Sequence, residues 1–179
     1  MQKYLEKAQV LIEALPYIRK FASKIVLIKY GGSAMENEEL KHCVMQDIAL
    51  LKLVGLKPVI VHGGGKDISK LCENLGVKSE FKNGLRVSDK ETTKIAEMAL
   101  LQINKNLVQN LECLGVKAIG ICGKDAGLLR CIKKDEDLGF VGEISKVKVG
   151  ILNELLEKDF LPVIAPVGMD ESLNTYNIN

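Results

Sequence analysis

Two short glycine-rich segments of the chain could together bind a phosphate group. Lys29 lies two residues before a glycine pair at 31–32, the first glycine loop, and His62 precedes a glycine triplet at 63–65, the second glycine loop. Each segment follows an apolar run typical of a β-strand and leads into a helical pattern, and ligands of open α/β sheets bind at such strand ends. Glycine lets the backbone approach a ligand closely, and free N–H groups at a helix start attract anions. The pattern predicts a phosphate held by both loops.

The lysine beside the first glycine loop suits phosphoryl transfer. The ammonium group of Lys29 could neutralise negative charge that develops on a phosphoryl group in the transition state. Taken alone, Lys29 could equally be an exposed lysine at a strand end, and either loop could be a plain tight turn. The presence of both loops and the lysine favours a phosphate site.

Neither loop matches a common nucleotide-binding motif. The chain contains no GxxxxGKS or GxxxxGKT sequence, which argues against a P-loop. The second glycine loop fails the GxGxxG pattern at its last position, and no acidic residue ends a following strand as that fingerprint requires. His62 could act in acid–base chemistry, but a packing or hydrogen-bonding role is more common for a histidine in this position.

An arginine follows a predicted hairpin turn. Asn83-Gly84 is a strong signal for a two-residue β-hairpin loop, and Arg86 comes two residues later. The planar guanidinium group of Arg86 could clamp a carboxylate through two parallel hydrogen bonds. The alternative is an arginine exposed on a short strand.

Strand-like and helical patterns alternate along the chain, which predicts an α/β fold with a mostly parallel sheet. Strands are expected at 24–30, 57–62, 117–122 and 161–165, and helices at 37–54, 65–75, 90–113 and 149–158. Ser88 or Asp89 could cap the helix that starts near residue 90. Residues 128–133 and 140–147 are expected to form a second hairpin.

The two ends of the chain differ from this alternating pattern. Residues 1–20 form an expected amphipathic helix, which Pro16 should kink or break, and its apolar stripe precedes the first core strand. Such a stripe needs a partner surface. Residues 173–179 are polar, and from composition alone a frayed tail is as plausible as an ordered segment.

Composition excludes several classes of protein. The 179 residues include 25 basic and 23 acidic side chains, well mixed, with a net charge of +2. No basic block suggests nucleic-acid binding, and neither a signal peptide nor a membrane-spanning run is expected. The five cysteines and two histidines lack the spacing of zinc ligands, so no metal site is expected. Reduced thiols in a cytoplasmic protein are the simplest interpretation.

Five motifs, in this order along the chain, resemble those of one family. They are Ile28-Lys29-Tyr30-Gly31-Gly32, Val61-His62-Gly63-Gly64-Gly65, Asn83-Gly84-Leu85-Arg86-Val87, Gly123-Lys124-Asp125-Ala126-Gly127 and Tyr176-Asn177-Ile178-Asn179. The chain resembles the N-acetylglutamate kinases of the amino-acid kinase family over its whole length. The resemblance implies a three-layer α/β sandwich preceded by a kinked helix. It also implies phosphorylation of the γ-carboxylate of N-acetyl-L-glutamate by ATP with Mg²⁺, a step of arginine biosynthesis.

The resemblance also implies roles for individual residues. Lys29 would be catalytic and would stabilise the transition state. The expected phosphate-binding residues are Gly31, Gly32 and Gly63. The expected substrate-binding residues are Gly64, Gly65, Arg86 and Asn177, with Arg86 on the α-carboxylate of N-acetylglutamate.

The resemblance covers only part of a complete family member, since such proteins continue beyond the last motif into a nucleotide-binding domain. We therefore expect an N-terminal oligomerisation helix at 1–20 and an N-acetylglutamate-binding domain at 21–179, inactive in isolation. The helix at 1–20 resembles the one that joins dimers into hexamers in members inhibited by arginine, which implies a homo-oligomer with arginine as feedback inhibitor. The alternatives are a related carboxylate or carbamate kinase and a non-catalytic binding or assembly module.

Overall fold

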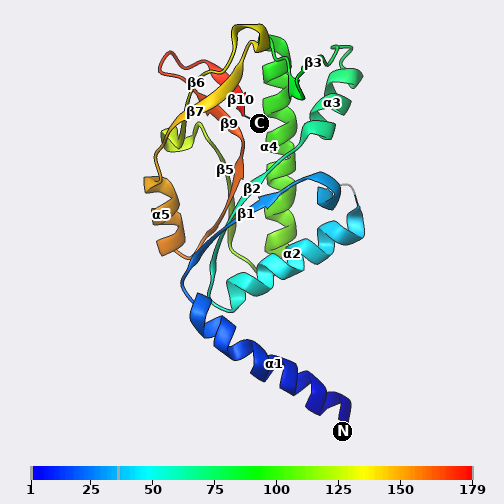
Figure 1. The fold of residues 1–179 in the computed structure, drawn as a ribbon, viewed down its shortest axis with the longest axis vertical. Helices are drawn as coiled ribbons and strands as arrows, with labels where there is room; N and C mark the ends of the chain where they lie inside the picture. The colour runs from blue at the N-terminus through cyan, green and yellow to red at the C-terminus, as the bar shows by residue number, and fades with distance from the viewer. Residues whose placement is uncertain (1, 36, 179) are drawn as a thin grey trace.

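A parallel sheet forms the centre of the computed structural model, which describes residues 2–35 and 37–178 (Figure 1). Its strand order is β1-β2-β8-β5, and every neighbouring pair is parallel. The strands are β1 (Ile25–Tyr30), β2 (Lys57–His62), β8 (Leu161–Ala165) and β5 (Ala118–Cys122). The four strands expected from the sequence are therefore present, and the predicted α/β class with a mostly parallel central sheet is confirmed.

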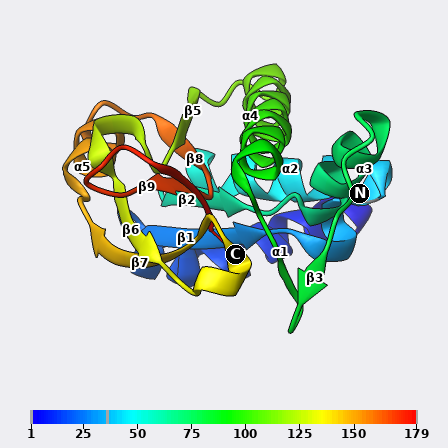
Figure 2. The same ribbon diagram turned by 90° about the horizontal axis from the view of Figure 1, so that it is seen from above.

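Helices cover both faces of this sheet and make the expected three layers (Figure 2). The α2 and α4 helices pack on one face around Ile60 and Val163, whereas α5 packs on the other face around Val59 and Ile164. The helices are α2 (Glu38–Leu53), α3 (Gly65–Asn74), α4 (Lys90–Cys113) and α5 (Gly150–Glu157). Aliphatic residues therefore fill the core on both sides of the sheet.

Side-chain caps set the starts of α2 and α4. The Asn37 side chain accepts a hydrogen bond from the Leu40 N–H at 3.0 Å, and Asp89 accepts one from the Thr92 N–H at 2.7 Å. Of the two capping residues considered for α4, Asp89 fills that position. Ser88 is buried and instead donates to the Arg86 carbonyl at 3.2 Å.

The Asn83-Gly84 hairpin is present. It joins β3 (Phe81–Lys82) to β4 (Leu85–Arg86), which pair antiparallel. The backbone φ angles of 53° at Asn83 and 77° at Gly84 are both positive, as the commonest two-residue hairpin turn requires. Turn chemistry thus explains the hairpin, and hydrogen bonds from Arg86 to Gly65 and Ser69 place it beside the start of α3.

A second, smaller sheet closes on itself beside the main one, with strand order β10-β7-β6-β9. Its strands are β6 (Leu129–Lys133), β7 (Val141–Val147), β9 (Val167–Met169) and β10 (Thr175–Ile178). The hairpin of β6 and β7 is as expected, and short 3-10 helices lie at Gly32–Met35, Asp125–Gly127 and Glu136–Leu138.

The frayed tail considered for residues 173–179 is wrong for the part of it that the structure describes. Within it β10 pairs with β9 and with β7, and Tyr176 and Asn177 are buried. Pairing with distant strands decides this conformation, and local composition could not indicate it. Asn179, the last residue of the tail motif, lies outside the described residues.

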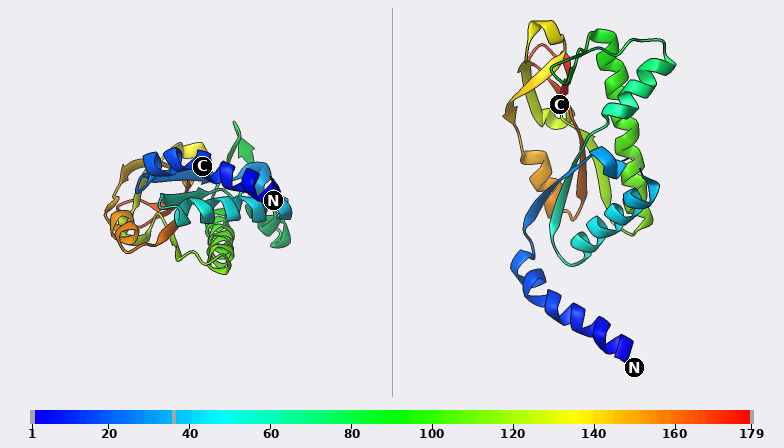
Figure 3. Two further views of the ribbon diagram at one scale, coloured as in Figure 1. Left: turned by 90° about the horizontal axis from the view of Figure 1, so that it is seen from below. Right: turned by 45° about the vertical axis from the view of Figure 1, so that its right-hand side comes forward.

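The N-terminal helix α1 (Gln2–Phe21) projects from the rest of the molecule (Figures 1 and 3). It continues through Pro16, so the proline does not break it. Leu5 and Leu11 are 65% and 68% exposed, so the apolar stripe is uncovered here. No helix among the described residues is long and apolar enough to cross a membrane.

We predict that removal of residues 1–20 leaves the rest of the chain folded. Because the apolar side chains of α1 are mostly exposed, its loss should change the free energy of unfolding by less than about 1 kcal/mol. Urea denaturation followed by circular dichroism measures this change. Leu161→Ala, at a fully buried position, is the positive control and should cost about 2–5 kcal/mol. Loss of cooperative unfolding after the deletion would show that α1 belongs to the core.

Candidate functional site

The two glycine loops lie side by side at the carboxyl ends of β1 and β2. These strands pair in parallel with Lys29 opposite Val61 and Tyr30 opposite His62. The Gly63 N–H donates to the Tyr30 carbonyl at 2.8 Å, which continues the pairing into the second glycine loop. The adjacency predicted for the loops is therefore present, and Lys29 lies on the same strand end.

The Gly63 N–H already has an acceptor in this arrangement. The resemblance implied that Gly63 binds phosphate, and here its N–H donates to the Tyr30 carbonyl at 2.8 Å. A Cβ at Gly63 would lie 3.9 Å from the Tyr30 carbonyl oxygen, an ordinary contact distance, so space alone does not require glycine there. The donors that remain in the loop are Gly64 and Gly65, at the start of α3, where N–H groups have no acceptor within the helix.

The first glycine loop turns sharply into a 3-10 helix. Gly32 has a φ of +64°, a conformation that glycine adopts without strain. Tyr30 is buried, and its hydroxyl donates to the Ala34 carbonyl at 3.0 Å, so the strand end fixes the turn that follows it. The loop therefore presents its backbone beside Lys29 in a defined conformation.

A cleft of about 700 Å³ joins all the site residues expected from the sequence. Its lining includes Lys29, Gly31, Gly32, Gly63, Gly64, Gly65, Arg86 and Asn177. These residues come from four separate places in the chain, so the fold brings together what the sequence keeps apart. The volume is within the usual range for a small-molecule site.

The cleft also has an apolar part that the sequence analysis did not indicate. Leu27 and Lys29 lie on the same face of β1, and below them the cleft is lined by Val59, Ile144 and Leu152. Leu27 is 68% exposed although it is apolar. Lys29 is itself exposed, so the cleft combines an accessible ammonium group with an apolar lining.

Arg86 is buried, so the exposed arginine considered from the sequence is wrong. Only 6% of its surface is exposed, and its guanidinium lies 4.7 Å from the centre of the Phe81 ring. Nη1 donates to the Ser79 hydroxyl at 2.6 Å, and Nη2 donates to the Gly65 carbonyl at 2.8 Å and to the Ser69 hydroxyl at 2.7 Å.

These contacts hold Arg86 in place for a ligand. Burial lowers the pKa of Arg86 from its ordinary value, but guanidinium groups stay charged in proteins. Its hydrogen bonds to the other described residues use three of its five N–H groups, and the other two can donate to an anion. The bond to Gly65 also ties the arginine to the second glycine loop.

His62 is 2% exposed and hydrogen-bonded at both ring nitrogens. Its Nδ1 lies 2.8 Å from the Gly63 carbonyl oxygen, and its Nε2 lies 3.3 Å from Nδ2 of Asn104. Burial lowers the pKa of His62, which keeps the ring neutral. The hydrogen-bonding role favoured for this histidine from the sequence is confirmed.

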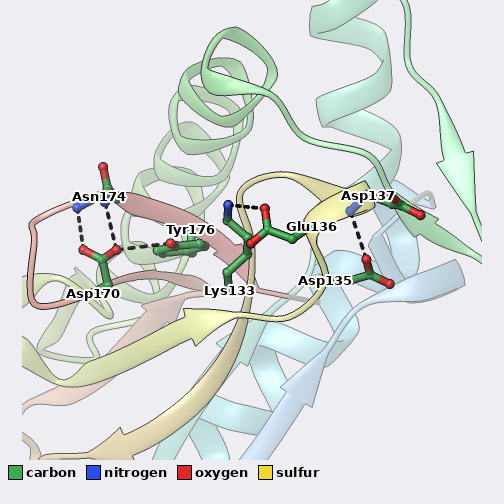
Figure 4. Close-up of polar contacts among 7 residues, drawn as sticks. All are labelled: Lys133, Asp135, Glu136, Asp137, Asp170, Asn174 and Tyr176. Atoms are coloured by element: carbon green, nitrogen blue, oxygen red, sulfur yellow. Dashed lines mark hydrogen bonds and ion pairs between the residues drawn. The ribbon is translucent and has the colours of Figure 1, made fainter.

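Two sets of side-chain contacts hold the start of β10, the strand that carries Asn177. In the turn before β10, Asp170 accepts hydrogen bonds from the Asn174 N–H at 2.8 Å, the Asn174 side chain at 2.9 Å and the Tyr176 hydroxyl at 3.1 Å (Figure 4). On the other side Lys124 donates to Thr175 at 3.2 Å and pairs with Glu97 of α4 at 2.8 Å.

The charge of Asp170 is part of this anchor. Desolvation acts to raise its pKa, but the hydrogen bonds from Asn174 and Tyr176 outweigh it and hold the pKa below its ordinary value of 3.8. The carboxylate is therefore ionised near neutral pH. Figure 4 also shows the loop between β6 and β7, where Lys133 pairs with Glu136 at 2.8 Å.

Sequence reasoning missed three residues that support the site. Lys124 lies in the motif at 123–127, to which the sequence analysis gave no role. Nothing in the sequence around Asp170 indicated that it would bind the Tyr176 hydroxyl. Asn104 lies in the middle of α4, where it contacts His62. A single polar residue in a long amphipathic helix does not reveal which neighbours it will contact.

Comparison with known proteins identifies the family to which this architecture belongs. A family model described as the amino acid kinase family matches residues 24–179. The chain belongs to the amino acid kinase family. Within the family, an acetylglutamate kinase from Campylobacter jejuni subsp. jejuni is 80% identical over 179 residues, which are 100% of this chain and 64% of that protein.

More distant members agree. An acetylglutamate kinase from Carboxydothermus hydrogenoformans is 51% identical over 191 residues, covering 100% of this chain and 65% of that protein. The solved structure of smu.665 from Streptococcus mutans UA159 matches with a TM-score of 0.78 and 31% identity, covering 86% of this chain and 63% of the other. The chain thus spans about 64% of the length of the acetylglutamate kinase from Campylobacter jejuni subsp. jejuni and 65% of that from Carboxydothermus hydrogenoformans.

We predict that Gly64→Ala destabilises this amino acid kinase more than Gly31→Ala. A Cβ at Gly64 would lie 2.6 Å from Ile103 Cδ1 and 2.9 Å from Leu100 Cδ2, so the ends of these two core side chains would have to move. Overpacking of this kind should cost about 1–3 kcal/mol of unfolding free energy. A Cβ at Gly31 would meet its nearest atom at 3.9 Å, so that variant should stay within about 1 kcal/mol of the parent. Equal unfolding midpoints in urea would contradict this packing.

We predict that Asp170→Asn loosens β10 and weakens ligand binding at Asn177. The loss should be about 1 kcal/mol of unfolding free energy, at the low end for charge-assisted bonds because the carboxylate contacts solvent. Since the pKa of Asp170 lies below 3.8 in the folded chain, the stabilisation is present above about pH 4 and is lost as the pH falls further. The difference between parent and variant should therefore narrow towards pH 3.

Tyr176→Phe is the matched control for this experiment, because it removes one of the three bonds to Asp170 and leaves the charge. Its effect on unfolding in urea should be smaller than that of Asp170→Asn. A difference between parent and Asp170→Asn that grows at low pH would mean that the carboxylate destabilises the turn.

Proposed function

We propose that this chain carries the acceptor site of an acetylglutamate kinase, where ATP phosphorylates the γ-carboxylate of N-acetyl-L-glutamate. One observation carries the proposal: a single cleft holds Lys29, both glycine loops and the buried Arg86. The relatives named acetylglutamate kinase, which are 80% and 51% identical to this chain, support the choice of substrate.

The buried guanidinium of Arg86 would bind the α-carboxylate of the substrate. It is the charged group of the cleft that is fixed on several sides, and a fixed guanidinium matches the geometry of a carboxylate. The N–H groups of Gly64 and Gly65 and the side chain of Asn177 would hold the acetylamino part. The γ-carboxylate would then lie towards the first glycine loop and Lys29.

Phosphoryl transfer in this arrangement needs no covalent intermediate on the protein. An oxygen of the γ-carboxylate attacks the terminal phosphorus of ATP and forms an O–P bond. The bond from that phosphorus to the bridging oxygen breaks, and ADP leaves with the bonding electrons. Lys29 and the N–H group of Gly32 would neutralise charge on the phosphoryl oxygens, so positioning and electrostatics supply the catalysis.

The resemblance includes Mg²⁺, which would accompany ATP and add positive charge at its phosphates. Among residues 2–35 and 37–178, no group of three or more His, Cys, Asp and Glu side chains is placed to hold a metal ion. On the protein side, Lys29 and backbone N–H groups of this chain would neutralise the charge on the transferring phosphoryl group.

We also infer that α1 mediates contacts between copies of the chain. Its apolar side chains are exposed on a helix that projects from the body, and burial against a second copy would remove them from water. Under the resemblance, such contacts join dimers into a hexamer and arginine inhibits the complete enzyme. Light scattering of the chain with and without residues 1–20 tests this role. The same number of chains per particle in both forms would show that α1 has no part in assembly.

We predict that the chain binds N-acetyl-L-glutamate in preference to L-glutamate, and that Arg86→Lys weakens this binding. Loss of a charge-assisted hydrogen bond from the guanidinium should cost about 1.5–3 kcal/mol, or more than about tenfold in Kd. Calorimetry with both ligands measures the effect. Arg19→Lys, the same substitution on the exposed α1 helix, is the matched control and should bind as the parent does.

Turnover is best tested in a protein extended by the part that the longer relatives contain. Trapping of the acyl phosphate with hydroxylamine detects the product, and Lys29→Ala should lower kcat more than it raises KM. An unchanged kcat would remove the catalytic role of Lys29. Equal heats for the two ligands in calorimetry would instead favour a related carboxylate or carbamate kinase, and binding without turnover would favour a non-catalytic module.

A further inference from the structure

A buried asparagine connects the central sheet to the second glycine loop. Asn104, in the middle of α4, is fully buried. Its Nδ2 donates to the Val163 carbonyl of β8 at 2.9 Å, and lies 3.4 Å from the Ile121 carbonyl of β5 and 3.3 Å from Nε2 of His62 at the end of β2. One amide group therefore contacts three of the four strands.

These contacts fix the tautomer of His62. The Gly63 carbonyl can only accept a hydrogen bond, so Nδ1 of His62, at 2.8 Å, must carry the proton. Nε2 faces the N–H donors of Asn104 and must therefore be unprotonated. The order of donors runs in one direction, from Asn104 to His62 and from His62 to Gly63.

The orientation of the Asn104 amide is itself constrained. Rotation of the amide by half a turn would place its oxygen against the Val163 and Ile121 carbonyl oxygens, which cannot donate. In the observed orientation Oδ1 is buried and has no hydrogen-bond partner among the described residues. It lies so close to Gly120 that a Cβ there would be 1.9 Å away, so glycine at 120 is required. An unpaired buried carbonyl is unfavourable, and the donor side of the amide must compensate for it.

The bond from His62 sets the direction of the next peptide group. In a trans peptide the C=O and the following N–H point in opposite directions. Because the Gly63 carbonyl points to the buried ring of His62, the Gly64 N–H points away from the core. Gly64 lines the cleft, and α4 packs behind it through Leu100 and Ile103.

We propose that Asn104 and His62 are positioning residues that orient the peptide between Gly63 and Gly64, so that the Gly64 N–H donates to an anionic oxygen in the cleft. The identity of that oxygen, on N-acetylglutamate or on the transferred phosphoryl group, rests on the function proposed above. The orientation of the peptide does not depend on that function. Neither residue touches the ligand, and both act through the loop.

Two substitutions of His62 separate positioning from simple stability. In His62→Asn the amide nitrogen can take the place of Nδ1 and still donate to the Gly63 carbonyl. In His62→Gln the longer side chain places its amide near the position of Nε2, and the bond to Gly63 is lost. Both variants lose the buried ring, so both should unfold at lower urea concentrations than the parent.

The two variants should differ in the loop and in binding. In His62→Gln the backbone amide resonance of Gly64 should move in ¹H–¹⁵N spectra, and the Kd for N-acetyl-L-glutamate should rise by about tenfold, the effect of one hydrogen bond. His62→Asn should keep both values nearer to the parent. Equal shifts and equal binding losses in the two variants would overturn the proposal and leave only a structural role.

The ring nitrogens of the unmodified chain supply a second test that needs no variant to fold. Long-range ¹H–¹⁵N spectra should show His62 with a proton on Nδ1 and none on Nε2 between pH 6 and about 8. A proton on Nε2 would overturn the proposed order of donors. If the parent chain binds no N-acetyl-L-glutamate, the proposed function fails, whereas the tautomer and the Gly64 resonance still decide the positioning role.

Discussion

The in-register pairing of β1 with β2 is the constraint on which the rest of the site depends. It places Tyr30 opposite His62 and lets the Gly63 N–H close the pair at 2.8 Å. A slip of one residue would turn Lys29 to the other face of the sheet, because side chains alternate along a strand. Tyr30 is buried and Ile28 packs beside it on the core face of β1, which fixes the face that Lys29 takes. The geometry of the cleft at the strand ends is therefore a consequence of packing along the strands.

The α4 helix supports this edge of the sheet from behind. Leu100 and Ile103 pack against the position of Gly64, and Asn104 holds His62. Further towards its N-terminus, Glu97 pairs with Lys124, which reaches β10. One helix thus contacts the supports of the second glycine loop and of Asn177. Two parts of the cleft that are more than a hundred residues apart in the sequence thus share one helix as a support.

The sequence predicted the elements whose signals are local. The run at 57–62 is apolar and bounded by glycines, and β2 has the bounds Lys57–His62. Asn83-Gly84 predicted its hairpin because only a few residues adopt two successive positive φ angles. In the same way, glycine loops after apolar runs predicted where the cleft would form. β9 and β10 could not be predicted, since these short strands depend on pairing with distant segments. The hydrogen bond from the Gly63 N–H to Tyr30 and the contact of Asn104 with His62 likewise join residues that are distant in the sequence, so they could not be predicted.

The pairing of β10 also sets the order in which the site can be completed as the chain is made. Synthesis runs from the N-terminus, so β1, β2 and both glycine loops leave the ribosome well before residues 175–178. Domains that rely on contacts between distant residues form those contacts late. Asn177 reaches the cleft only when β10 has paired with β7 and β9. Under the function proposed above, the glycine loops are therefore synthesised early, whereas the contact of Asn177 with the substrate would be among the last that the folding chain acquires.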